Sequence, residues 1–174
     1  MKRGFSVLVI VLFTAGLTVY GQSARKYIKA GEEFVRNGMY DDAIEQFSRA
    51  IDEAPASPEG YIKRAGAYES TGNYGLAYDD YHRAVSFESD DTGILFNLGR
   101  MCNKLASAEG ATPDERQRYF LEAVEVLQKA INVEYRNGKL YTEKVVSLIG
   151  LELWDKALGA SDTAIQMRDD AINY

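Results

Sequence analysis

One pattern of large and small residues recurs four times in this chain at a nearly fixed spacing. Each copy has a large residue, Ala three positions later, another residue four positions on, and Ala three positions after that. The copies are Tyr40–Ala43–Phe47–Ala50, Tyr74–Ala77–Tyr81–Ala84, Phe120–Ala123–Leu127–Ala130 and Trp154–Ala157–Ser161–Ala164. The outer steps are 34 residues and the middle step is 46, which is 34 plus an insertion of 12. A period of this length is typical of a solenoid, in which each repeat buries its apolar face by stacking on its neighbours.

A second recurring set precedes each copy and predicts a first helix in every repeat. A small residue recurs at Gly31, Ala65 and Gly99, with Val145 in the fourth copy. A large residue stands four positions before it in each copy, at Tyr27, Tyr61, Leu95 and Tyr141, and an apolar or aromatic residue three positions after it, at Phe34, Tyr68, Cys102 and Leu148. This spacing places all three on one helix face, where the small residue permits close packing of two helices. Asn37–Gly38, Gly72–Asn73 and Gly150 mark the expected turns.

The residues resemble the tetratricopeptide repeat family, whose outline is W-x2-L-G-x2-Y, then A-x3-F, then P. The first copy, from Gly31 through Phe47 to Pro55, matches this outline closely, and the fourth departs most, with Val145 and Ser161. The resemblance implies an all-α fold, a right-handed α-solenoid of stacked helix-turn-helix repeats. We expect four repeats over residues 24–171, namely 24–57, 58–91, 92–137 with the 12-residue insertion, and 138–171.

Residues 1–21 have the features of a secretory signal peptide. Lys2 and Arg3 precede an apolar run that ends near Tyr20, and we place cleavage after Gly21. A retained anchor is the alternative, but the run is shorter than the roughly 20 apolar residues of a membrane-spanning helix. The chain is therefore expected to be exported and to be periplasmic or extracellular, without a stable membrane span in its mature form.

Composition excludes one class of partner. The chain has 20 basic and 26 acidic residues, a formal net charge of −6, and removal of the leader makes it more negative. This balance lacks the basic surplus that nucleic-acid binding needs. The single cysteine, Cys102, cannot form an internal disulfide and occupies a packing position.

The insertion should lengthen the second helix of the third repeat. Residues 107–111 end the preceding helix. Thr112 with Glu115 forms a capping box, and Pro113 takes the first helical position. We expect this helix to run from Pro113 to about Glu134. Its first turns should project, carrying Arg116, Arg118 and Tyr119 as a tolerated extension or as a rim at one end of a groove.

No combination of residues predicts catalysis, a cofactor or a metal site. His82 is the only histidine and falls on the outer face of a second helix. The acidic run at residues 88–91 lacks the glycine and distal glutamate of a calcium loop. We therefore do not expect an enzyme.

The resemblance also implies a concave groove lined by the first helices. The partner-binding residues predicted on it are Ile28, Glu32, Arg36, Ile62, Lys63, Phe96, Asn97, Arg100, Lys104, Lys139 and Thr142. Ile28, Ile62, Phe96 and Thr142 align as a mostly apolar ladder flanked by cations. Members that bind chaperones clamp a terminal carboxylate at positions where this chain has suitable residues only at Lys63 and Asn97, so that clamp does not carry over.

Two functions follow. The first is a scaffold or adaptor of the cell envelope that binds a segment of another protein in the groove. The alternative is a structural subunit that self-associates, or docks on an envelope assembly, through a fourth repeat without a capping helix, where Leu148, Ile165, Met167 and Ile172 lack cover.

Overall fold

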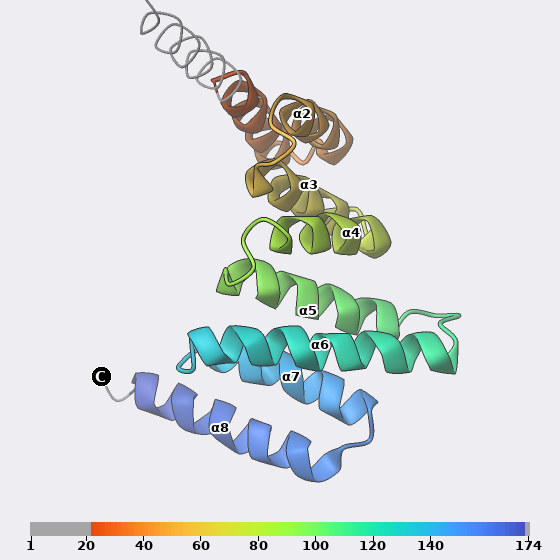
Figure 1. Cartoon of the computed structure of the whole chain (residues 1–174), viewed down its shortest axis with the longest axis vertical. Coiled ribbons are helices and arrows are strands. Elements are labelled where there is room, and N and C mark those ends of the chain that lie inside the picture. Colours follow the sequence, from red (N-terminus) through yellow and green to blue (C-terminus); the bar gives the residue numbers. More distant parts are fainter. Residues whose placement is uncertain (1–21, 173–174) are drawn as a thin grey trace, which may run out of the picture.

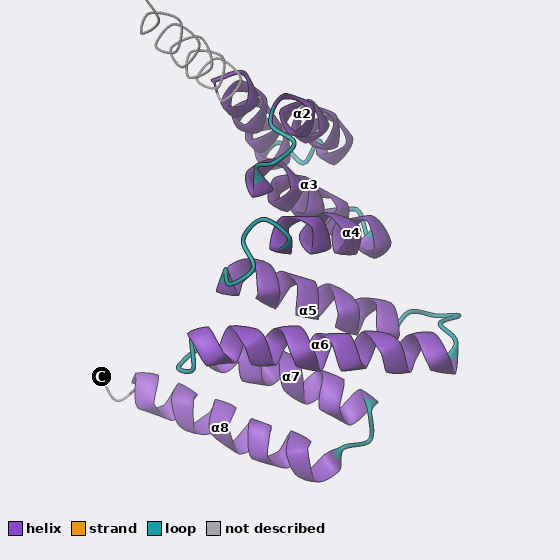
Figure 2. Cartoon of the chain, in the orientation of Figure 1, coloured by secondary structure: helices purple, strands orange, loops and turns teal. Residues whose placement is uncertain are grey.

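The computed structural model describes residues 22–172 and shows only helices and connecting loops in that range (Figure 2). The predicted signal segment, residues 1–21, lies outside the described residues. A first helix covers residues 22–36. It is followed by α2 (Tyr40–Glu53), α3 (Pro58–Ser70), α4 (Tyr74–Val85), α5 (Thr92–Ala106), α6 (Pro113–Val133), α7 (Gly138–Gly150) and α8 (Trp154–Ile172).

The helices stack in chain order along the long axis of the molecule (Figure 1). Each helix packs against the next, from α2 to α8, and α5 also contacts α7. The molecule is therefore an all-α solenoid of antiparallel helix pairs. The first helices of the pairs are the helix over 22–36, α3, α5 and α7, and the second helices are α2, α4, α6 and α8.

The small residues of the first helices make the close contacts that the repeat pattern predicts. A Cβ atom added to Gly99 would lie 2.6 Å from Leu127 Cγ, and one added to Gly31 would clash with the ring of Phe47. Phe47 and Leu127 are almost fully buried. In the fourth pair the larger residue, Val145, is on the first helix and the smaller one, Ser161, is on the second. The first three pairs thus place a large side chain of the second helix over a small residue of the first.

Three of the turns within pairs share one backbone arrangement. Gly38 and Gly72 have φ angles of 74° and 78°, and Glu152 has φ 58° at the corresponding position of the fourth pair. In each turn the next amide donates to a carbonyl five residues back, as Met39 N does to Phe34 O at 2.9 Å. This is a helix C-terminal motif that favours glycine. α7 ends at Gly150, as predicted, but the residue with positive φ in this turn is Glu152, and Gly150 itself lies against the ring of Phe120.

The insertion lengthens α6 as expected. The hydroxyl of Thr112 accepts from the Glu115 amide at 3.2 Å, and the Glu115 carboxylate accepts from the Thr112 amide at 2.9 Å, which completes the capping box. Tyr119, predicted on the projecting turns, is half-buried. Its ring packs edge-on against Tyr78 of α4, with centroids 5.7 Å apart, and Tyr78 Oη donates to Glu122 at 2.9 Å. The extension is therefore attached to α4 at its inner end.

Candidate interaction surfaces

The predicted groove residues all lie on the first helices, and the structure brings neighbouring ones together. We call this surface the first-helix face and define it by Glu32, Ile62, Lys63, Glu69, Phe96 and Arg100. Ile28 does not belong to it. Only 5% of Ile28 is exposed, and it packs in a core cluster with Ala43, Phe47 and Ala67, because α3 covers it. Ile62 and Phe96 are half-buried and pack on the main core with one side only.

Two ion pairs connect successive first helices across this face. Lys63 Nζ on α3 donates to Glu32 on the preceding first helix. Arg100 on α5 donates from both terminal nitrogens to the Glu69 carboxylate on α3, at 2.7 and 2.8 Å. Both pairs span 31 residues in sequence. Lys63 and Arg100, which the sequence places beside the apolar ladder, are thus neutralised by Glu32 and Glu69 of neighbouring repeats, and the recurring 31-residue interval between opposite charges was a signal of this pairing in the sequence.

At the third junction an asparagine, in place of a cation, connects the two first helices. Asn103 on α5 is 5% exposed and donates to the Glu143 carbonyl on α7 at 3.0 Å, while Ser147 Oγ donates to Asn103 Oδ1 at 2.7 Å. Each pair of neighbouring first helices is thus joined by side-chain hydrogen bonds. These bonds align the first helices side by side and fix the shape of the face that they form.

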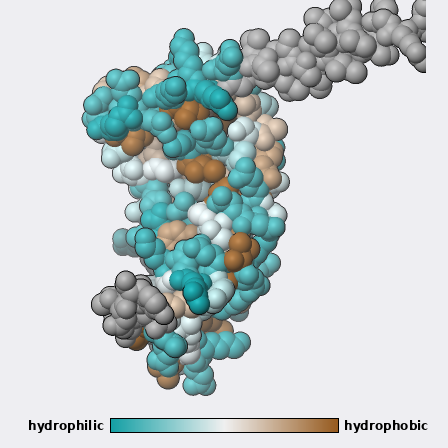
Figure 3. All heavy atoms as spheres, turned by 90° about the vertical axis from the view of Figure 1, so that its left-hand side faces the viewer, coloured by the Kyte–Doolittle hydropathy of each residue, from teal (hydrophilic) through white to brown (hydrophobic). Residues whose placement is uncertain are grey.

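The remaining predicted groove residues are distributed around this face. Asn97 Oδ1 accepts from Arg100 at 3.1 Å, and the guanidinium of Arg100 lies 5.7 Å from the Phe96 ring centre. Lys104 lies over the Tyr74 ring at 5.7 Å. Arg36 and Lys104 lie at its edges, near the C-terminal ends of their helices. These two residues, Lys139 and Thr142 are all exposed. The left-hand side of Figure 1, seen face-on in Figure 3, is mainly hydrophilic with separate hydrophobic patches.

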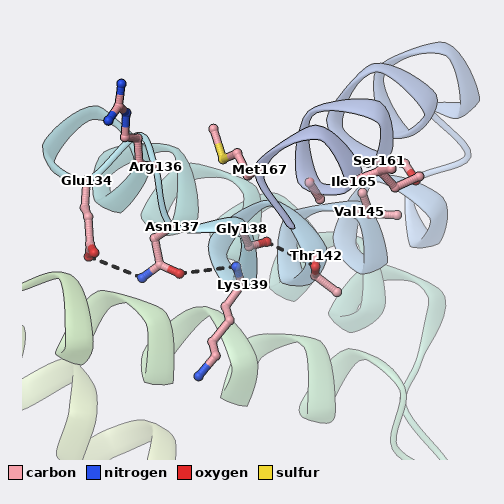
Figure 4. Close-up of a pocket in the computed structure, with 11 residues that line it drawn as sticks. Glu134, Arg136, Asn137, Gly138, Lys139, Thr142, Val145, Ser161, Ile165 and Met167 are labelled. Carbon is pink, nitrogen blue, oxygen red and sulfur yellow. Dashed lines mark hydrogen bonds between the residues drawn. The ribbon is translucent and has the colours of Figure 1, made fainter. Parts of the chain in front are cut away.

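A pocket of about 720 Å³ lies at the outer side of the fourth pair. Val145 of α7 and Ser161, Ile165 and Met167 of α8 line it. Arg136, Lys139 and Thr142 also line it, although the side-chain ends of Arg136 and Lys139 extend outward (Figure 4). The residues that correspond to Ile165 in earlier repeats, Ile51 and Ile131, are 9% and 6% exposed because the next first helix covers them. Ile165 is 47% exposed, so this stacking face is open in the described residues.

The other apolar residues at this end of the molecule differ from one another in exposure. Leu148 is 2% exposed and belongs to the interior, contrary to the expectation that it lacks cover. Met167 is half-buried, and Ile172 lies where side chains are outside the described residues. Val146 and Ile149 of α7 are 43% and 44% exposed.

The described residues contain no group of three or more His, Cys, Asp or Glu side chains arranged to hold a metal ion. His82 is exposed beside the Tyr78 ring. Cys102 is fully buried, and burial raises the pKa of its thiol. None of the helices over residues 22–172 is both long and apolar enough to cross a membrane.

The fold defines a class, the α-solenoids of tetratricopeptide type, and solved structures of that class resemble this chain. The crystal structure of MamA superimposes with a TM-score of 0.74 over 100% of this chain and 99% of MamA, at 18% identity. A thermophilic TPR protein of Thermus thermophilus has a TM-score of 0.65 over 84% and 75% of the two chains, at 23% identity. The first TPR of Spaghetti, bound to an HSP90 peptide, has a TM-score of 0.63 over 76% and 95%, at 21% identity.

Sequence comparison gives a weaker relationship. The photosystem I assembly protein Ycf3 of Prochlorococcus marinus (strain MIT 9313) is 28% identical over 141 residues, which is 78% of this chain and 76% of Ycf3. No family model matches the chain. The comparisons therefore establish a tetratricopeptide-like fold.

Proposed function

We propose that this protein is a non-enzymatic interaction module, a scaffold or adaptor that binds a segment of a partner protein on the first-helix face. The observation that carries the proposal is the alignment of four first helices by cross-repeat hydrogen bonds, which holds Ile62 and Phe96 half-exposed in one row. A row of partly buried apolar side chains between satisfied polar groups can anchor an extended or helical segment. The solved Spaghetti TPR with its HSP90 peptide and the assembly protein Ycf3 support a polypeptide as the ligand class.

The ion pairs change the expected chemistry of this surface. Because Glu32 neutralises Lys63 and Glu69 neutralises Arg100, the middle of the face attracts an acidic segment only weakly. We therefore assign affinity to Phe96 and Ile62 and orientation to the exposed Arg36 and Lys104 at the edges.

Site-specific photo-crosslinking tests which surface the partner contacts. A benzoylphenylalanine at position 104 lies on α5 at the first-helix face, and one at position 49 lies on α2, where Arg49 is exposed and forms only a local pair with Glu45. In the native cell, crosslinks should form from position 104 and not from position 49. Crosslinking from position 49 alone would show that the partner binds the second helices instead.

Export is part of the same proposal and is supported by residues 1–21 of the sequence. The mass and N-terminal sequence of the protein from its natural cell should show a chain that begins at Gln22. A chain that begins at Met1 in the cytoplasmic fraction would contradict export.

A second candidate function is self-association or docking through the fourth pair, and the open stacking face favours it. Ile149 and Ile165 are 44% and 47% exposed there. If this face associates, Ile165→Glu should shift the sedimentation coefficient to that of a monomer. Leu76→Glu, at an equally exposed residue of α4, is the control and should leave association unchanged.

A further inference from the structure

A cleft of about 520 Å³ opens between the second helices α6 and α8, with α7 at its base. Val124, Leu148 and Leu153 supply apolar walls, and Lys144, Lys156 and Ala160 also line it. The cleft therefore combines an apolar floor with two cations and is separate from the first-helix face.

The second repeat shows what a cation does at the position of Lys144. Arg64 of α3 corresponds to Lys144 of α7 in the repeat register. Its guanidinium donates to Ser48, 16 residues earlier, at 2.9 Å. It also donates to both oxygens of Asp80, 16 residues later, at 2.7 and 2.8 Å. Asp80 is only 6% exposed, so Arg64 is neutralised within the fold.

Lys144 has a hydrogen-bond partner 16 residues earlier, as Arg64 does, but no carboxylate 16 residues later. Its Nζ donates to Gln128, again 16 residues earlier. Sixteen residues later stands Ala160, which carries no carboxylate and lines the cleft. Among the side chains that the structure describes, none forms an ion pair with Lys144 or Lys156.

The environment of Lys144 makes this position unfavourable for an unpaired cation. In the third repeat the corresponding residue is Leu98, which is 1% exposed. Burial and then the nearby charge of Lys156 lower the pKa of Lys144. A partly desolvated ammonium gains most from an added carboxylate.

The neighbouring junction has a different chemistry at the corresponding place. Between α4 and α6, Tyr78 and Tyr119 line a pocket of about 480 Å³, and Tyr78 donates to the internal acid Glu122. In the repeat register Val124, Lys156 and Leu153 replace Tyr78, Glu122 and Tyr119. Smaller apolar side chains and a cation thus stand where the earlier junction has an aromatic pair and an internal acid.

We propose that this cleft is a second binding site, beyond the function proposed above, for an acidic residue within an apolar segment of a partner polypeptide. Its carboxylate occupies the place that Asp80 has in the second repeat and pairs with Lys144 and Lys156. Adjacent apolar side chains of the segment pack on Leu121, Val124 and Leu153. A polypeptide fits better than a small amphiphile, because Leu121 and Leu153 at the cleft are 51% and 38% exposed and extend the apolar surface beyond it.

Fluorescence anisotropy with the purified protein tests the site. The probe is a fluorescein-labelled octapeptide with the central sequence Leu-Leu-Glu-Leu, compared with a twin that has Gln in place of Glu. The Glu probe should bind at least tenfold more tightly than the Gln probe. Lys144→Met should weaken Glu-probe binding at least tenfold, while Lys129→Met, on the surface of α6 beside Asp90, should not change it.

Ala160→Asp is the sharpest variant, because it supplies an internal carboxylate like that of Asp80. It should raise the melting temperature above that of Ala160→Asn and weaken Glu-probe binding at least tenfold. Equal binding of the two probes, no binding of either, or Glu-probe binding unchanged in Ala160→Asp would overturn the proposal. Dodecanoate binding that depends on Lys144, without peptide binding, would overturn the choice of a polypeptide. Arg36→Glu, on the first-helix side, should leave probe binding unchanged. A negative result for the cleft can therefore be told apart from a negative result for the first-helix face.

Discussion

Arg100 holds the carboxylate of Glu69 with two parallel hydrogen bonds of 2.7 and 2.8 Å and so joins α5 to α3. The two side chains are 30% and 24% exposed. A fork-shaped contact of this kind is geometrically specific, since the planar guanidinium matches the carboxylate. The pair makes Arg100 part of the solenoid's architecture as well as part of its surface.

Replacing either partner of this pair should therefore reduce stability. In a double-mutant cycle with Arg100→Ala and Glu69→Ala, chemical denaturation should give a coupling energy of about 1 kcal/mol, at the upper end for partly exposed pairs. The Arg49–Glu45 pair, whose side chains are 52% and 58% exposed, is the matched control. It should show a coupling of about 0.3–0.5 kcal/mol. Equal couplings would mean that the cross-repeat geometry adds nothing.

Gly99→Ala should destabilise the protein by about 1–3 kcal/mol, because the added methyl group would lie 2.6 Å from Leu127 Cγ in a fully buried contact. Thermal unfolding measures the change. Gly66 lies in the interior of α3 with open space around it, so Gly66→Ala should stabilise by about 0.5–1 kcal/mol. If both substitutions stabilise, the close packing of α5 on α6 is not as described.

Tyr78→Phe should cost about 1 kcal/mol, because it removes the hydrogen bond to Glu122 that joins α4 to α6. Burial and this bond to Glu122 both raise the pKa of Tyr78, so the hydroxyl stays a donor at neutral pH. Tyr61→Phe is the control, since its hydroxyl makes an exposed 3.2 Å bond to the Pro55 carbonyl. Its unfolding free energy should change by less than about 0.5 kcal/mol. A larger loss for Tyr61→Phe would contradict this ranking.

The capping box predicts a pH dependence confined to acid. Hydrogen bonds from the Thr112 amide and then its hydroxyl lower the pKa of Glu115 below its unfolded value. The carboxylate therefore stabilises the fold above the unfolded pKa, and that contribution is lost as pH falls through the lower folded pKa. Glu115→Gln should lower the melting temperature at pH 7, and the difference from wild type should shrink steadily as the pH is lowered through the acid range. A difference that persists undiminished in acid would show that charge is not involved.

The helix pairs follow from local properties and could be read in the sequence. The spacing of Gly31, Phe34, Ala43 and Phe47 specifies two helix faces and the size of each contacting residue, and the structure buries Ala43 and Phe47 as that spacing requires. The start of α6 at Pro113 depends on residues within one turn, so Thr112 and Glu115 were sufficient to predict it.

The predicted surface was less complete, because it depends on how repeats are placed next to one another. Ile28 has the spacing of a groove residue, but α3 lies over it and buries it. Lys63 and Arg100 indicate a basic face when each helix is considered alone. In the structure they pair with Glu32 and Glu69 of neighbouring repeats. Helix periodicity describes one helix at a time and does not say which residue of the next repeat it meets.

The sequence by itself determined the number of repeats, their helix faces and the size pairing of their contacts, because these depend on residues separated by short, regular intervals. The tertiary structure alone decided which charges are satisfied. Arg64 and Lys144 hold the same repeat position, yet Asp80 neutralises one, and the other faces a cleft beside Ala160. That difference arises where three helices meet, and a cation's ionic environment is set by every side chain within a few ångströms, whatever its distance along the chain.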